Sequence, residues 1–95
     1  MGMLSDELKQ IKIQINGHSW NTISIDDYRK MKERLFPFIE NYQEDELLKT
    51  AKEVKTNLEI LCMDNGNFFA NTYNAKIEEN KEDAFTKLVE VLKKI

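Results

Sequence analysis

The sequence predicts an α+β fold in which helices cover a small, mainly antiparallel sheet of about three strands. Residues 11–15 and 73–78 alternate apolar and polar side chains at period two, and in residues 58–63 Leu58, Ile60 and Cys62 alternate with Glu59, Leu61 and Met63. Such alternation is typical of half-buried strands, and we predict strands over 11–15, 58–63 and 68–78. Between and after these segments, apolar residues recur at steps of three and four, which is typical of amphipathic helices. The 95 residues are enough for one domain, so we predict a single domain, 1–95, with element order β-α-α-β-β-α.

The first predicted strand carries Ile11, Ile13 and Ile15 on one face. β-branched residues at period two fit the pleated surface of a sheet. Asn16 and Gly17 follow and are typical of a turn. The segment therefore predicts a strand with one covered face.

A first helix is predicted to begin after Ser24, whose hydroxyl can accept a hydrogen bond from the amide of Asp27. Its apolar stripe keeps one phase on both sides of Pro37. An interior proline costs about 3 kcal/mol, but the continuous phase predicts a kinked helix that continues through it. The stripe consists of Tyr28, Met31, Leu35, Phe38 and Tyr42.

A second helix is predicted to begin around Glu44, and a third around Asn80. Between them, the turn 64–67 joins the strands 58–63 and 68–78 into a hairpin, because Asp, Asn and Gly tolerate positive φ. The apolar stripe of the second helix consists of Leu47, Leu48, Ala51 and Val54, and that of the third of Phe85, Leu88, Leu92 and Ile95.

One resemblance to known families is carried by residues 58–95. This run places Asp64-Asn65-Gly66-Asn67 between two predicted strands and Glu82-Asp83-Ala84-Phe85 at the start of the last helix. It resembles the strand, Asp-Gly turn, strand and helix pattern of HicB-type antitoxins, and is similar to small α/β sandwich proteins of phages of Gram-positive bacteria. The resemblance implies a fold and a phage or mobile-element context, and no functional residue is carried over from it.

Charge argues against a nucleic-acid partner. The chain holds 14 Lys and Arg against 17 Asp and Glu, a net charge of −3, whereas phosphate-binding proteins normally show a basic face. Acidic residues interrupt the nearest basic run, 29–34. No apolar run approaches the roughly 20 residues of a membrane span, and residues 1–10 do not resemble a signal peptide. With a single cysteine, these features predict a cytoplasmic protein without membrane contact.

The sequence offers little for catalysis or for cofactor binding. His18 is the one histidine, and Cys62 is predicted to face the core of the sheet as a small buried hydrophobe. We therefore predict a non-enzymatic protein with no cofactor. A carboxylate site for Mg²⁺ or Ca²⁺ is the alternative, although acidic residues also gather at helix N-termini for their dipoles. Two clusters could form it: Glu44, Asp45 and Glu46, or Glu78, Glu79, Glu82 and Asp83.

Side chains suited to a protein interface remain. Trp20, Phe36 and Phe68 are the predicted anchors, because aromatic residues carry much of the energy of interfaces. For Trp20 the alternative is that its ring folds back and caps the core. The acidic residues Glu44, Asp45 and Glu46 are predicted to form a second contact with a basic partner.

Three functional classes follow, and the leading one is a non-enzymatic accessory or inhibitor protein that binds another protein. The second is an antitoxin-like or regulatory module that forms a homodimer and contacts nucleic acid through Arg29, Lys30, Lys32 and Arg34. The third is a small metal-binding or enzymatic domain, for which the sequence offers few convergent polar groups.

Overall fold

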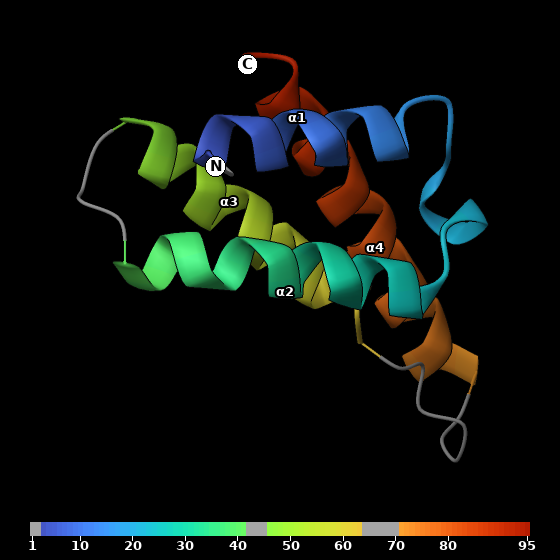
Figure 1. Ribbon diagram of the computed structural model, residues 1–95. Coiled ribbons are helices and arrows are strands. Elements are labelled where there is room, and N and C mark those ends of the chain that lie inside the picture. Colours follow the sequence, from blue (N-terminus) through green and yellow to red (C-terminus); the bar gives the residue numbers. More distant parts are fainter. Residues whose placement is uncertain (1–2, 42–45, 64–70) are drawn as a thin grey trace.

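The computed structural model describes residues 3–41, 46–63 and 71–95, and within these ranges it contains helices and no strand (Figure 1). The elements are α1 (Leu4–Ile15), the short 3₁₀ helix η1 (Trp20–Thr22), α2 (Ile25–Asn41), α3 (Glu46–Leu61) and α4 (Asn71–Leu92). The predicted α+β fold, with its sheet and its β-α-α-β-β-α order, is therefore wrong. The described part of the chain is a helical bundle.

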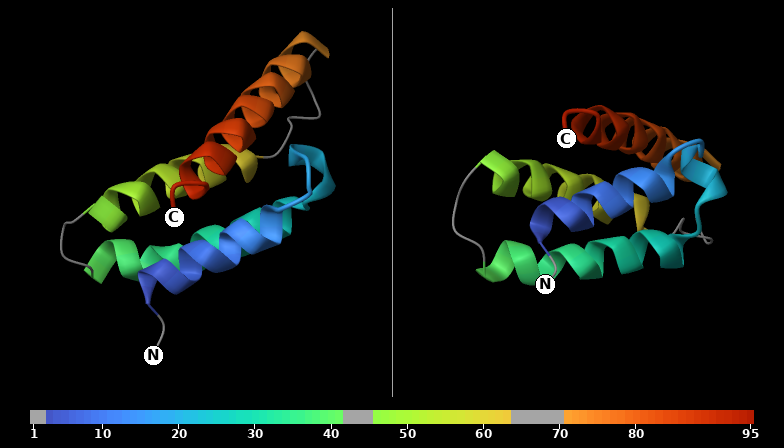
Figure 2. Two further views of the ribbon diagram at one scale, coloured as in Figure 1. Left: turned by 90° about the horizontal axis from the view of Figure 1, so that it is seen from above. Right: turned by 45° about the horizontal axis from the view of Figure 1, so that its top comes forward.

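The bundle is organised around α3, which packs against α2 on one side and against α4 on the other. Helix α1 contacts all three longer helices (Figures 1 and 2). Arg34 ties α1 to α2: its Nε lies 3.3 Å from Glu7 Oε2, and one of its terminal nitrogens donates to Gln14 Oε1 at 2.9 Å.

A single apolar core joins the helices, and every long helix contributes a stripe to it. Burying such side chains contributes roughly 1.5–3 kcal/mol each, which makes the core the main source of stability. Its buried members are Leu4, Leu8, Ile11, Ile15, Ile23, Tyr28, Met31, Leu35, Ala51, Val54, Leu58, Leu61, Ala84, Phe85, Leu88 and Leu92.

The segment predicted as the first strand is the second half of α1. Ile11 and Ile15 are buried, whereas Ile13 is 70% exposed. A helix brings residues four apart to one face and turns the residue between them away, whereas a strand would put all three on one face. Leu4 and Leu8 precede Ile11 at steps of four and three, so the buried stripe of α1 is helical over its whole length.

The predicted hairpin is also wrong. Residues 58–61 form the last turn of α3, and residues 71–78 lie in α4, which begins at Asn71 and not at Asn80. Val54, Leu58 and Leu61 are buried together at steps of four and three, as one helical face requires. The predicted turn 64–67 and the start of the second strand, 68–70, lie outside the described residues.

Two predictions for α2 are confirmed. The amide of Asp27 donates to Ser24 Oγ at 3.1 Å, so Ser24 caps the helix as expected. The helix continues through Pro37 as far as Asn41, and Tyr28, Met31 and Leu35 are buried on one face. Tyr42, the last residue of the predicted stripe, lies outside the described residues.

No helix in the described ranges has both the length and the apolarity that a membrane crossing requires.

Candidate protein-binding groove

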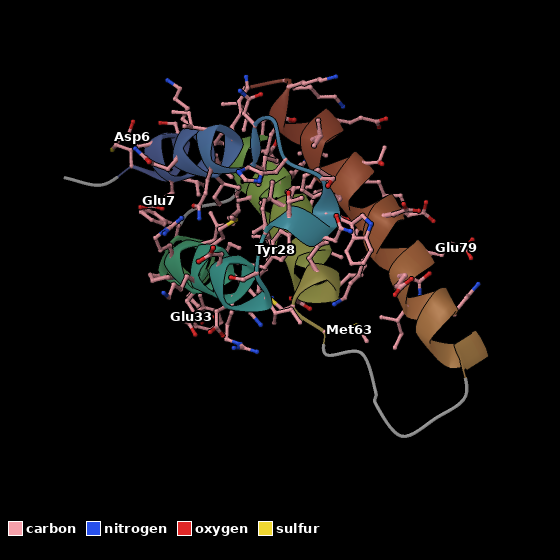
Figure 3. All side chains as sticks on the ribbon, turned by 90° about the vertical axis from the view of Figure 1, so that its right-hand side faces the viewer. Asp6, Glu7, Tyr28, Glu33, Met63 and Glu79 are labelled. Atoms are coloured by element: carbon pink, nitrogen blue, oxygen red, sulfur yellow. The ribbon has the colours of Figure 1, made fainter. Side chains whose placement is uncertain are left out.

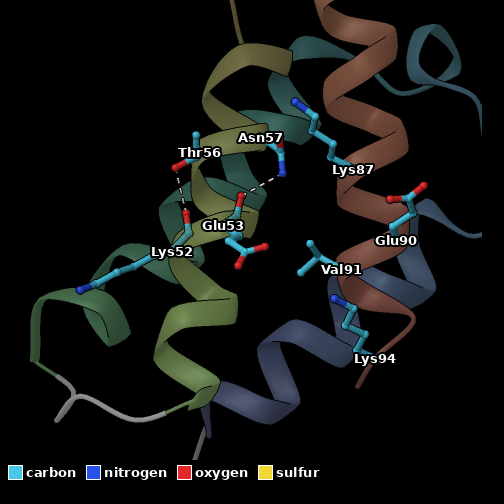
Figure 4. A pocket seen from close by; sticks show the side chains of 8 residues that line it. All are labelled: Lys52, Glu53, Thr56, Asn57, Lys87, Glu90, Val91 and Lys94. Atoms are coloured by element: carbon cyan, nitrogen blue, oxygen red, sulfur yellow. Dashed lines mark hydrogen bonds between the residues drawn. The ribbon is translucent and has the colours of Figure 1, made fainter.

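A hollow of about 540 Å³ lies between α3 and α4 (Figure 4). Each helix contributes one wall. The residues that line each wall recur at steps of three or four, as residues on one face of a helix do. The α3 wall consists of Lys52, Glu53, Thr56 and Asn57, and the α4 wall of Lys87, Glu90, Val91 and Lys94.

A second hollow of about 180 Å³ continues the first along the same two helices, because Asn57 and Lys87 line both. We call the combined surface the α3–α4 groove. From Asn80 to Lys94 it spans about 21 Å along α4, at a rise of about 1.5 Å per residue. The second hollow adds Ile60, Met63, Asn80, Asp83 and Ala84 to the walls.

Apolar side chains occur along the length of the groove. Met63 is 50% exposed at the end of α3 (Figure 3), and Ile60 is half-buried one turn before it. On α4, Ala84 is buried and Val91 is half-buried. A partner therefore meets aliphatic surface at both ends of the groove.

The two uncharged polar side chains of the α3 wall, Thr56 and Asn57, are already hydrogen-bonded within α3. Thr56 Oγ1 donates to the carbonyl of Lys52 at 3.0 Å, and Asn57 Nδ2 donates to the carbonyl of Glu53 at 3.0 Å (Figure 4). Both side chains therefore donate to carbonyls of the preceding helical turn and not to a bound peptide. The groove thus offers aliphatic surface and charged ends, and few donors for the backbone of an extended peptide.

The charged ends on the α4 wall are not neutralised. Lys87 and Lys94 are exposed, and their ammonium groups make no hydrogen bond or ion pair with a described residue. In Figure 4 both extend from α4 toward the α3 side, as Val91 does, whereas Glu90 points away. Lys87 and Lys94 therefore present positive charge to this part of the groove, whereas Asp83 lines the second hollow.

The structure places the predicted interface residues elsewhere. Trp20, in η1, is half-buried against the core, which agrees with the alternative that it caps the core. Phe36 is 51% exposed on the outer side of α2. Glu46, the first residue of α3, is exposed and lies 3.5 Å from Lys49 Nζ. None of the three lines the groove, and Phe68, Glu44 and Asp45 lie outside the described residues.

Sequence reasoning missed the groove residues, although a signal was present. Lys87, Val91 and Lys94 recur at steps of four and three, which places them on one flank of α4. The flank becomes a wall only because α3 lies beside it.

His18 and Cys62, the residues that catalysis could use, do not line the groove. His18 is exposed, and its Nδ1 lies 3.0 Å from Thr22 Oγ1. Cys62 is half-buried, and burial raises the pKa of its thiol. Within the described ranges, no three His, Cys, Asp or Glu side chains gather as metal ligands would.

The basic run of α2, predicted as the alternative nucleic-acid contact, is partly paired. Arg29 lies 2.7 Å from Asp26 Oδ1, and Arg34 is engaged with α1 through Glu7. Each pair reduces the local positive charge available to a phosphate backbone.

Tyr28 is the most strongly perturbed titratable residue described. Its side chain, labelled in Figure 3, is 2% exposed, and its hydroxyl donates to the carbonyl of Trp20 at 2.6 Å. Burial, and to a lesser extent the nearby Cys62, raise the pKa of Tyr28 well above its ordinary value of 10.0. The neutral phenol thus fixes η1 to α2 at one end of the core.

We expect this phenol to make the protein sensitive to alkali. Because the folded pKa lies above the unfolded one, its contribution to stability is complete below pH 10 and is lost as the pH rises toward the folded pKa. The unfolding free energy should then fall by up to about 1.4 kcal/mol per pH unit. Urea melts of the wild type and of Tyr28→Phe from pH 8 to 11.5 measure it, since the variant should show a shallower decline. Parallel declines would contradict the assignment.

No protein-family model matches this chain, and no curated protein or solved structure matches it either. Its function is therefore inferred from the residues of the α3–α4 groove.

Proposed function

We propose that this protein is a cytoplasmic, non-enzymatic accessory module that binds another protein by holding a helix of that protein in the α3–α4 groove. The observation that carries the proposal is the groove itself, which is continuous along two packed helices and shows aliphatic and charged side chains together. Recognition of an amphipathic helix in a groove between helices is a common mode of protein binding.

The hydrogen bonding of the groove favours a helix over an extended peptide. A helix satisfies its own backbone groups, whereas an extended segment needs donors and acceptors from its host. Thr56 and Asn57 already donate to their own helix. A third helix can also pack on two neighbouring helices by placing the ridges of its side chains in the grooves between theirs.

The dimensions of the groove suit a helix of moderate length. A span of about 21 Å corresponds to about 14 helical residues, or four turns. Met63 and Ile60 at one end and Val91 toward the other would contact an apolar stripe on that helix. Their exposed or half-buried state leaves apolar area that a partner can cover.

A photo-crosslinking amino acid placed in the groove tests the proposal. Thr56 is exposed on the α3 wall, and Thr86 is an exposed threonine of α4 that does not line the groove. We expect benzoylphenylalanine at position 56 to form a defined adduct in cells of the native host, with the cross-link mapping to a helical segment of the partner. The same group at position 86 should not form this adduct. Equal adducts from both positions, or none from position 56, would contradict the proposal.

A further inference from the structure

We infer that the helix bound in the α3–α4 groove carries acidic side chains on the flank that faces α4. This inference rests on the proposed function and adds the chemistry of the partner. The charges that face the groove in Figure 4 differ between its two sides, with Lys87 and Lys94 on the α4 side and Glu53 on the α3 side, so they can select both the composition and the orientation of a helix laid between them.

The α4 wall presents two lysines at positions that one helix can meet. Lys87 lies in α4, and Lys94 lies in the turn directly after it, where its amide donates to the carbonyl of Val91 at 3.2 Å. The two lysines are seven positions apart, about 10.5 Å at helical rise, and lie on the same flank about two turns apart. Neither ammonium group is paired with a described residue, and both extend toward the α3 side in Figure 4. Acidic residues at the same two-turn spacing on a neighbouring helix would face both lysines, as charged pairs flank the seam of a coiled coil.

On the α3 wall, the charged side chain that faces Val91 is acidic. Glu53 is exposed, and its carboxylate makes no hydrogen bond or ion pair with a described residue. In Figure 4 its side chain extends from α3 toward Val91. A partner helix with an acidic flank would avoid Glu53 only if that flank turned toward α4. Glu53 therefore fixes the orientation, and the two lysines supply the attraction.

Two synthetic helical peptides provide the probe. Both have 18 residues and one leucine stripe; one carries glutamates at two-turn spacing beside the stripe, and the other carries lysines at the same positions. Fluorescence anisotropy should show that the glutamate peptide binds the full chain at least tenfold more tightly than the lysine peptide. The double variant Lys87→Glu/Lys94→Glu should reverse this preference. Circular dichroism and denaturant melts verify that every variant is folded.

The matched control is Lys9→Glu/Lys30→Glu. Both lysines are exposed on other helices, make no bond with a described residue, and change the net charge by the same amount when replaced. We expect this control to keep the preference for the glutamate peptide. If both double variants change the preference equally, net charge and not the groove selects the peptide, and the inference is overturned.

A third variant separates this inference from the proposed function. Thr56→Trp fills the groove and should weaken binding of the glutamate peptide at least tenfold, whereas Thr86→Trp should not. If Thr56→Trp blocks both peptides but they bind the wild type equally, the groove holds helices and the acidic flank is wrong. If neither peptide binds, or if Thr56→Trp changes the binding of neither, the groove is not a helix-binding site and the proposed function fails as well.

Discussion

Replacing Ile11 with lysine is expected to destabilise the protein by about 4 kcal/mol or more, whereas Ile13→Lys is expected to change the unfolding free energy by no more than about 0.5 kcal/mol. Ile11 is completely buried in the core, where a lysine would lose its hydration without gaining a partner. Ile13 is 70% exposed on the opposite side of α1, where a lysine remains in water. Urea melts of both variants at neutral pH measure the difference.

The pair separates a helix from a strand with the same chemical change. In a strand, residues 11 and 13 share one face, and the two substitutions would have similar costs. Similar costs for both variants would contradict the helical assignment of α1. The two isoleucines serve as each other's control, since they have the same flanking residue types.

The second large effect is expected for Leu88→Ala, which should lower the unfolding free energy by about 2 to 5 kcal/mol. Leu88 is fully buried where α4 packs on the rest of the bundle, so its truncation removes apolar contacts and leaves a cavity. Thr86→Ala, two residues away on the exposed side, is the control and should be nearly neutral. A loss below about 1 kcal/mol for Leu88→Ala would place α4 outside the core.

The sequence predicted correctly those helices whose apolar residues fit the helical period and do not also fit the period of two that is typical of a strand. In α2, Tyr28, Met31 and Leu35 recur at steps of three and four, and no alternation of period two competes with them. The same holds for Phe85, Leu88 and Leu92 in α4. These stripes and the Ser24 cap were predicted correctly, including the passage through Pro37.

The short segments predicted as strands were ambiguous for a physical reason. Residues at i and i+4 share a face in both a helix and a strand, and only the residue between them distinguishes the two. In α1 that residue is Ile13, which is apolar but exposed. With Ile11 and Ile15 it gives the alternating pattern of a strand, although the segment is helical. The longer series from Leu4 through Leu8 to Ile11 follows the helical period and decides between them.

The same ambiguity affected the end of α3 and the beginning of α4. Leu58, Ile60 and Cys62 alternate, yet Leu58 also continues the helical stripe of Val54 and leads to Leu61. In α4 a lysine, Lys81, occupies a buried position between Ile77 and Ala84 and is 3% exposed. Because a charged residue normally marks a solvent-facing position, it concealed the stripe N-terminal to Ala84.

The sequence predicted the kind of site, a protein interface, but not the residues that form the groove. Aromatic composition suggested a protein interface, but a lone exposed ring such as Phe36 is common on protein surfaces, and Trp20 packs against the core. The groove depends on how two helices that are distant in the sequence lie together. Asn57 and Lys87 are 30 residues apart, and no local pattern relates them.

A nuclear Overhauser spectrum of the full chain tests the central claim, a groove between two packed helices, most directly. The structure predicts Hα to Hβ contacts between residues i and i+3 throughout 46–61 and 76–92, together with contacts between residues of α3 and residues of α4. Cross-strand Hα to Hα contacts between residues 58–63 and 71–78 would contradict it, because they would put an antiparallel hairpin in place of both walls of the groove.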